Sequence, residues 1–292
     1  MHFDDLKKII HLAHSQNIQV SAKALCITAG ALSKTLKKIE NHLQTDLFDR
    51  VGRNIQINAQ GKKFINYALN ITHEYEQMCS EFTDKRRNYL LKVSGPAVLL
   101  DDCLKKIIPL VSRDNTELTV EALYEGDALK RLVNGQSHIA IVTNEVLGDV
   151  SALALSSVSL GATKYEVVAG HKHKIFTDFP DGHVALKDLV NYSFICPKTS
   201  PFCGIERGVG SDGWLDHKYP RKILSRSDDL NVLLSIVNQN IMLAYIPDIV
   251  INKEKLRIIN VTDYSHEYTE EYSVVYKQST ADGWLNQLID KL

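Results

Sequence analysis

Small and basic side chains recur at helical spacing between residues 29 and 41, and their types suit contact with a nucleic acid. In chain order they are Ala29, Gly30, Ser33, Lys34 and Lys37. Small residues allow a helix to approach base edges closely, whereas lysines neutralise phosphates and release counterions. The chemistry that this face could perform is therefore binding to duplex DNA.

Two short helices and a tight turn must hold this face in place. The stretch 21–40 reads as two amphipathic helices broken near residues 26–28, with Thr28 as the expected N-cap of the second helix. Leu32, Leu36 and Ile39 follow at spacings of four and three, and they form an apolar stripe on the opposite face. This is the pattern of a helix-turn-helix. A solvated lysine face on an ordinary core helix is the alternative for this segment alone.

The next segment, residues 46–58, predicts a hairpin. Residues 51–54 have turn chemistry, and apolar residues alternate with polar ones after the turn. A hairpin that follows a recognition helix is a wing. Arg50 and Arg53 at its tip would meet phosphates or the minor groove.

Residues 3 to about 68 resemble the winged helix-turn-helix of LysR-type transcriptional regulators. The matching residues are Ala22, Leu25, Ile27, Thr28, Ala31, Leu32, Ser33, Ile39, Glu40, Leu43, the run 47–50 and Arg53. The resemblance implies that DNA is bound through Ala29, Gly30, Ser33, Lys34, Lys37, Arg50 and Arg53. The family usually has a Gln-Pro pair at Ala29-Gly30, and Ala29 offers only apolar contact. Recognition of the DNA sequence then depends more on Ser33, Lys34 and Lys37, or on the shape of the DNA.

We expect three parts in the chain: a DNA-binding domain over 1–58, a linker helix over 59–89 and an effector-binding domain over 90–292. Apolar residues at spacings of three and four run along the linker, which suits pairing with a second copy. The resemblance implies a homodimer or homotetramer that contacts RNA polymerase. Packing of this helix on its own domain is the alternative.

From residue 90 the pattern alternates short apolar strands with helices, which predicts an α/β fold with helix-covered parallel sheets. We expect strands near 90–95, 118–123, 139–142, 192–196 and 242–247, and helices near 98–113, 127–134 and 230–238. This half resembles the LysR effector domain, whose two-lobed fold is similar to periplasmic solute-binding proteins. The first lobe would cover about 90–161 and 263–292, and the second lobe about 162–262.

Two such lobes create a cleft at their strand ends, where α/β sheets bind ligands. Family positions that line this cleft match Ser94, Pro96, Thr143, Thr199, Ser200 and Phe202, so the resemblance implies these residues as effector contacts. The start of the helix after Pro96 could hold an anion, so an organic anion is the class of effector that we expect. A cap or turn role is the alternative for each residue.

Charge and hydropathy agree with a DNA reader joined to a sensor. The net charge is −1, but residues 1–89 carry +4 and the remainder −5. No apolar run approaches the length of a membrane span, and the N-terminus lacks the pattern of a signal peptide. We expect a cytoplasmic protein without membrane contact.

Other chemistries find less support. The chain has no nucleophile elbow, Walker or HExxH motif and no clustered metal ligands, so we expect no enzyme, cofactor or metal. Cys196 and Cys203 lie seven positions apart, in the region where peroxide-sensing members of the family switch, so redox sensing is the alternative function. Cys26, Cys79 and Cys103 are expected to be buried. The glycine-rich run 203–214 predicts a surface loop; a loop at the cleft mouth, with Arg207 facing an acidic ligand, is the alternative.

Overall fold

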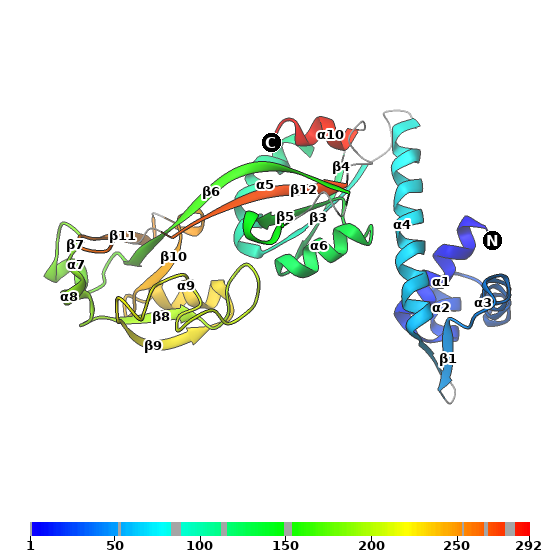
Figure 1. Ribbon diagram of the computed structural model, residues 1–292, viewed down its shortest axis with the longest axis horizontal. Coiled ribbons are helices and arrows are strands. Elements are labelled where there is room, and N and C mark those ends of the chain that lie inside the picture. Colours follow the sequence, from blue (N-terminus) through cyan, green and yellow to red (C-terminus); the bar gives the residue numbers. More distant parts are fainter. Residues whose placement is uncertain are drawn as a thin grey trace. The chain divides into compact units, whose positions relative to one another are not determined.

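A computed structural model describes residues 2–51, 54–82, 89–111, 116–148, 154–252, 254–265, 268–277 and 284–292. The chain divides into two compact units. One comprises residues 1–87 and 133–136, and the other comprises residues 88–132 and 137–292 (Figure 1). Within the described ranges, no helix is long and apolar enough to cross a bilayer.

The first unit contains the predicted helix-turn-helix and wing. Its elements are α1 (Phe3–Ser15), α2 (Ile18–Ala24), α3 (Ala29–Leu43), β1 (Phe48–Val51), β2 (Asn54–Ile57) and α4 (Ala59–Phe82). Ile9, Leu12 and Leu32 are completely buried at the centre of a core that the three helices share with the wing. The apolar stripe predicted on α3 thus faces this core.

The turn between α2 and α3 has the predicted cap. The Thr28 hydroxyl accepts a hydrogen bond from the backbone N–H of Ala31 (3.1 Å) and so satisfies one donor that the helix start would leave free. Cys26 adopts the left-handed conformation (φ 53°) in the turn and is exposed. The prediction that Cys26 is buried was therefore wrong, because the apolar periodicity of α2 ends before this residue.

Three side-chain hydrogen bonds hold the wing and the start of α4. Glu40 accepts from the N–H of Leu47 (2.8 Å), and Gln16 accepts from the N–H of Ile57 (3.2 Å). Asn58 caps α4 by accepting from the N–H of Gly61 (2.9 Å). A Cβ atom at position 61 would lie 2.1 Å from the Leu47 carbonyl oxygen, so only glycine allows this close approach.

The stripe predicted along α4 divides into two halves. Ile65 and Ala68 are buried in the core of their own unit. Further along, Ile71, Tyr75 and Met78 are 48%, 44% and 50% exposed, although the ring of Phe3 contacts Tyr75. The part of the predicted linker at 83–88 lies outside the described residues.

The second unit is built on a mixed sheet. Its strands are β3 (Tyr89–Gly95), β4 (Thr116–Ala122), β5 (Ile139–Thr143), β6 (Leu155–Gly170), β7 (His183–Val184), β10 (Ala244–Pro247), β11 (Leu256–Val261) and β12 (Thr269–Lys277). The strand order is β4-β3-β5-β12-β6-β11-β7, with β10 also paired to β6. β3, β4 and β5 are parallel, as predicted, whereas β12 runs antiparallel to both β5 and β6.

The long strand β6 joins the two predicted lobes. Its first part pairs with β12, and its last residues pair with β10 and β11 (Figure 1). The register between β6 and β12 shifts next to Tyr272, the partner of Gly161, at the predicted lobe boundary. The boundaries themselves stay a prediction.

Helices cover both parts of this sheet. α5 (Ala97–Val111), α6 (Glu125–Val133) and α10 (Trp284–Ile289) belong to the first lobe. The second lobe contains α7 (Ile175–Asp178), α8 (Leu186–Leu189), α9 (Leu230–Asn238) and the parallel pair β8 (Ser193–Pro197) and β9 (Lys222–Ser227). The short 3₁₀ helices η1 (Asn144–Val146) and η3 (Asp248–Val250) follow β5 and β10.

The tight contact at Gly61 makes a prediction about stability. Gly61→Ala should destabilise the first unit by about 2 kcal/mol, because the new methyl group meets backbone atoms that cannot move aside. Hydrogen exchange of the amides of residues 47–65, measured by mass spectrometry on the full chain, should rise accordingly. Gly30→Ala is the control: nothing lies within 4 Å of that position, and a helical alanine should stabilise by about 0.5–1 kcal/mol. Equal exchange in both variants would contradict this account.

Candidate DNA-binding surface and effector cavity

The predicted DNA-binding face of α3 points to solvent. Gly30, Lys34 and Lys37 are exposed, and Ala29 and Ser33 are half-buried. Because the opposite stripe is buried, the orientation of α3 is determined by packing and not by the lysines. The backbone at the start of α3 is therefore accessible to a partner.

The three lysines of α3 have different surroundings. Lys38 contacts the buried Asp5 carboxylate of α1, with its Nζ atom 3.2 Å from Oδ2. Burial alone would raise the pKa of Asp5, but the N–H of His2 and the charge of Lys38 outweigh it and lower that pKa. Lys34 and Lys37 form no ion pair with any described residue, so their charges are available to a partner.

The wing contributes one described arginine. Arg50 is exposed on β1, opposite Ile55 in the hairpin register and one residue before the end of the strand. Arg53 lies outside the described residues. The hairpin is thus where the sequence predicted it, with Arg50 close to its tip.

A cavity of about 800 Å³ lies between the predicted lobes of the second unit. The first lobe lines it with Pro96, Ala97, Val98, Asp101, Tyr124 and Asp127. From the second lobe come, among others, Tyr165, Thr199, Pro201, Asp212, Asp228, Asp229 and Tyr245. Of the predicted effector contacts, Pro96 and Thr199 line this cavity.

The other four predicted contacts do not line the larger cavity, and each has a partner within the protein. Ser94 is buried and donates to the hydroxyl of Ser137 (3.0 Å). The N–H of Thr143 donates to the Glu125 carboxylate (2.6 Å). Ser200 caps the turn that follows it and borders a second cavity of about 390 Å³, and the buried Phe202 packs edge-on against the ring of Tyr165.

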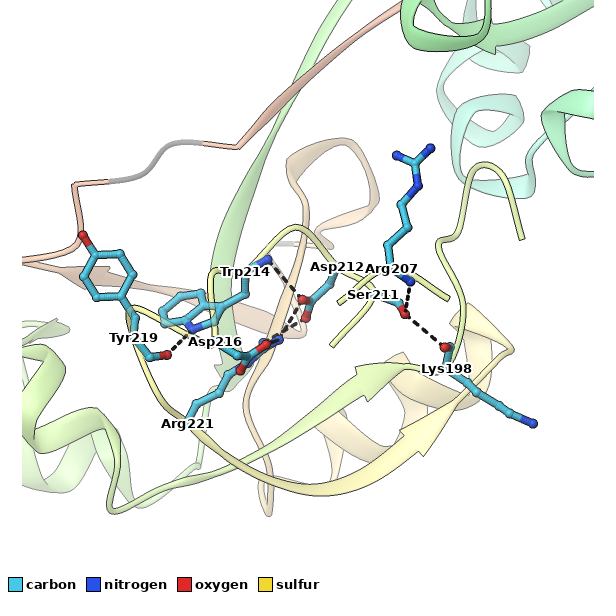
Figure 2. Close-up of polar contacts among 8 residues, drawn as sticks. All are labelled: Lys198, Arg207, Ser211, Asp212, Trp214, Asp216, Tyr219 and Arg221. Carbon is cyan, nitrogen blue, oxygen red and sulfur yellow. Dashed lines mark hydrogen bonds and ion pairs between the residues drawn. The ribbon is translucent and has the colours of Figure 1, made fainter. Parts of the chain in front are cut away.

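A buried arginine organises the loop that forms one wall of the cavity. The guanidinium of Arg221, 1% exposed, donates to both carboxylate oxygens of Asp212 (2.7 and 2.8 Å) and to Asp216 (2.9 Å), as Figure 2 shows. The rings of Phe194 and Trp214 lie 5.3 and 5.2 Å from it. Burial disfavours the charged guanidinium, but the carboxylates outweigh it and raise the pKa of Arg221. Sequence reasoning missed this residue, since no spacing rule connects it to two aspartates earlier in a loop.

The same loop reaches the first lobe. Ser211 accepts from the N–H of Arg207 (3.0 Å) and donates to the carbonyl of Lys198 (3.1 Å), so it holds the backbone at Arg207 (Figure 2). The Arg207 side chain donates to Glu145 in η1 (2.6 Å). Beside it, the N–H of Glu125 donates to the carbonyl of Phe202 (3.1 Å). One interpretation of the sequence was that Arg207 faces an acidic ligand. In the structure its side chain instead contacts Glu145.

Two buried carboxyl groups lie beside this contact. Burial raises the pKa of Glu125; Glu270 and Glu145 act in the same direction, and the hydrogen bonds from Thr143 oppose them. Burial also raises the pKa of Glu270, against the hydrogen bond that the Tyr268 hydroxyl donates to it. The junction of the lobes therefore holds two carboxyl groups whose pKa values are raised by burial.

The cysteine pair of the redox alternative has an unreactive member. Cys196 is buried, which raises its pKa to about 12, so little thiolate exists at neutral pH. Cys203 is half-buried, and both residues are free thiols. In the described part of the chain, no three His, Cys, Asp or Glu side chains gather as metal ligands.

Family models match both units of the chain. The model described as "Bacterial regulatory helix-turn-helix protein, lysR family" matches residues 3–62, and the "LysR substrate binding domain" model matches residues 86–292. The chain belongs to the LysR family. It contains the helix-turn-helix and the substrate-binding domain of that family, as the resemblance predicted.

Individual relatives agree with this assignment. CitR of Bacillus subtilis (strain 168), an HTH-type transcriptional regulator, is 24% identical over 145 residues, which are 48% of this chain and 50% of CitR. CzcR of the same strain is 23% identical over 247 residues, 82% of this chain and 76% of CzcR. The match to CitR thus spans about half of that protein's length. These relatives are transcriptional regulators, in line with the prediction that the LysR-type chain is not an enzyme.

Solved structures share the fold. A full-length OxyR variant from Pseudomonas aeruginosa has a TM-score of 0.67 at 14% identity, covering 100% of this chain and 96% of that chain. CbnR complexed with its target DNA has a TM-score of 0.65 at 15% identity, covering 100% and 98%. The predicted fold class, a winged helix-turn-helix followed by an α/β effector domain, is confirmed.

The raised pKa of Glu125 predicts a pH dependence. Because its pKa is raised, the Glu125 carboxyl binds its proton more tightly in the folded protein than in the unfolded chain. The contribution of this group to the free energy of unfolding therefore falls as the pH rises from 4.5 through the raised pKa. Glu125→Gln keeps an acceptor for the N–H of Thr143, and it should stabilise the fold at pH 7 by on the order of 1 kcal/mol. Thermal unfolding between pH 4.5 and 8 should show a flatter profile than the wild type. Glu117→Gln, at an exposed position, is the control; an unchanged profile in Glu125→Gln would contradict the assignment.

The Arg221 cluster predicts a large loss of stability. Arg221→Ala should cost about 3–5 kcal/mol, because two carboxylates would be buried without their counter-charge. Adding Asp212→Asn and Asp216→Asn should recover part of that loss. Urea unfolding followed by fluorescence is suitable, since the two tryptophans, Trp214 and Trp284, both belong to the second unit. The exposed Lys222→Ala is the control, and a loss no greater than in that variant would contradict the prediction.

Proposed function

We propose that this LysR-type protein binds specific DNA sites through α3 and the wing and that a small molecule in the inter-lobe cavity controls this binding. The observation that carries the proposal is the free basic face of α3 in one unit, together with a cavity of about 800 Å³ in the other. The first unit thus suits DNA recognition, and the second unit suits binding of a small molecule that regulates it.

Within the reader, we assign roles residue by residue. Lys34, Lys37 and Arg50 neutralise phosphates, and we assign the same role to Arg53. Ala29, Gly30 and Ser33 lie at the start of α3, where a recognition helix meets base edges. Since Ala29 and Gly30 have no side chain that donates or accepts, Ser33 and DNA shape supply most of the discrimination.

The proposed form is a homodimer or homotetramer. Support comes from the exposed apolar side chains on the second half of α4: Ile71, Tyr75 and Met78 are each more than 40% exposed. Exposed apolar residues at helical spacing gain stability by packing against a second copy. Two-fold symmetric DNA half-sites call for a two-fold reader. RNA polymerase is the further partner we propose, and action on DNA would place the protein in the cytoplasm.

For the sensor, we propose Pro96 and Thr199 as direct effector contacts, with Ser94, Thr143, Ser200 and Phe202 supporting the walls around them. The loop that contains Thr199 also carries Arg207, which contacts Glu145 on the first lobe. A ligand that binds one arrangement of the lobes better than another would shift their populations, and this shift would change the spacing of the DNA readers. The low reactivity of the buried Cys196 favours this function over redox sensing.

DNA binding tests the proposal directly. Lys34→Ala and Lys37→Ala should each weaken binding to a fragment from upstream of the protein's own gene by about threefold to tenfold at physiological salt. Each should reduce the slope of log K against log[salt] by about 1, because one phosphate contact is lost. Fluorescence anisotropy over 50–200 mM salt measures both quantities.

Lys38→Gln is the matched control on the same helix, since Lys38 contacts Asp5 and is not among the proposed phosphate contacts. It should leave the affinity and the slope unchanged. If all three variants bound DNA like the wild type, the proposed role of this face would be wrong.

A further inference from the structure

We propose that the effector of the inter-lobe cavity is an organic cation, an amine-bearing compound with an apolar body. This inference rests on the proposed function of that cavity and adds the class of its ligand. It differs from the organic anion expected from sequence, because the side chains that line the cavity became known only from the structure.

The charged side chains that line the cavity are all carboxylates. They are Asp101, Asp127, Asp212, Asp228 and Asp229, and no lysine or arginine is among the described lining residues. Binding an anion here would require burial of like charges without a positively charged partner.

Three of the five carboxylates are already matched by cations outside the lining. Lys105 contacts Asp101 (3.0 Å), Lys130 contacts Asp127 (2.9 Å) and Arg221 contacts Asp212. Asp228 and Asp229 form no ion pair with any described residue. The uncompensated negative charge is thus concentrated at the start of α9, on the second-lobe wall.

The partial positive charge at the N-terminus of α9 does not cancel the negative charge of Asp228 and Asp229. Asp229 is the N-cap of α9 and accepts a hydrogen bond from the N–H of Val232 (3.0 Å), so the carboxylate already offsets the partial positive charge of the helix. The start of α5 at Ala97 also borders the cavity, but a helix end is worth about half a charge. The negative side chains outweigh it.

The remaining wall suits the body of such a ligand. Tyr165 and Tyr245 line the cavity with their rings 5.2 Å apart, and an aromatic face attracts a cation. Tyr245 is 2% exposed, and its hydroxyl lies beside the Tyr264 hydroxyl and the backbone of Tyr268.

An organic cation fits better than a metal ion. The described residues contain no group of three or more His, Cys, Asp or Glu side chains placed to ligate one metal. A cavity of about 800 Å³ lined by both carboxylates and tyrosines has room for a molecule with a carbon skeleton.

Paired probes test the sign of the ligand charge. Thermal-shift and calorimetric titrations of the full chain would compare amines with carboxylates of the same carbon skeleton, such as 1,4-diaminobutane with butanedioate and benzylamine with benzoate. Quaternary ammonium compounds would extend the amine series. We expect binding of at least one amine and of none of the paired carboxylates.

Charge-neutral variants locate the site. Asp228→Asn with Asp229→Asn should weaken amine binding by about fivefold to tenfold, while asparagine at 229 still caps α9. Asp181→Asn, at an exposed position outside the cavity lining, should leave it unchanged. Amine binding that the double variant leaves intact would overturn the inference.

The inference and the proposed function fail in different ways. A carboxylate that binds the wild type but not Ala97→Trp, which fills the cavity rim, would preserve the proposed effector site and overturn the cationic class. The absence of binding by every amine would overturn it as well. Loss of DNA retardation by the ligand-free protein would instead count against the proposed function.

Discussion

The buried guanidinium of Arg221 is the interaction on which the effector half of this LysR-type regulator depends most. Two carboxylates and one arginine are withdrawn from water together, and such charges are tolerated only when each finds its partner with good geometry. Asp212 and Asp216 must therefore converge on one point, and this convergence dictates the course of the loop. A Cβ atom at Gly210 would lie 2.0 Å from the guanidinium, so the glycine provides the room for the charge.

That loop connects the cavity with the junction of the lobes. Its outer part carries Arg207 to Glu145, and the carbonyl of Phe202 meets the N–H of Glu125. Asp212, held by Arg221, lines the cavity from the same loop. One loop therefore contributes both to the cavity wall and to the contacts that join the lobes. The same junction buries Glu125 and Glu270, and burial raises the pKa of both carboxyl groups.

The DNA-binding unit separates structural charges from available ones. Lys38 contacts Asp5 and links α3 to α1, whereas Lys34 and Lys37 on the same helix face solvent. The wing is tied to the helices through Glu40 and Gln16. These contacts fix the wing and α1 relative to the helix that carries the basic face.

Local features of this protein could be predicted from its sequence. The cap at Thr28, the hairpin after residue 46 and α9 at Leu230–Asn238 depend on neighbouring residues only, and each is present where it was predicted. The family, too, was evident from ordered local motifs. Periodicity reports which side of an element is buried, but not which element covers it.

The remaining features depend on contacts between residues far apart in the chain. Three examples are the antiparallel pairing of β12 with β5, the ion pair between Arg221 and Asp212, and the hydrogen bond from Ser94 to Ser137. The sequence by itself determined that a basic helix and an α/β half exist on one chain, because local patterns encode both. Only the tertiary structure decided which charges stay available and which residues line the cavity, because pairing of buried charges depends on distances that no local pattern encodes.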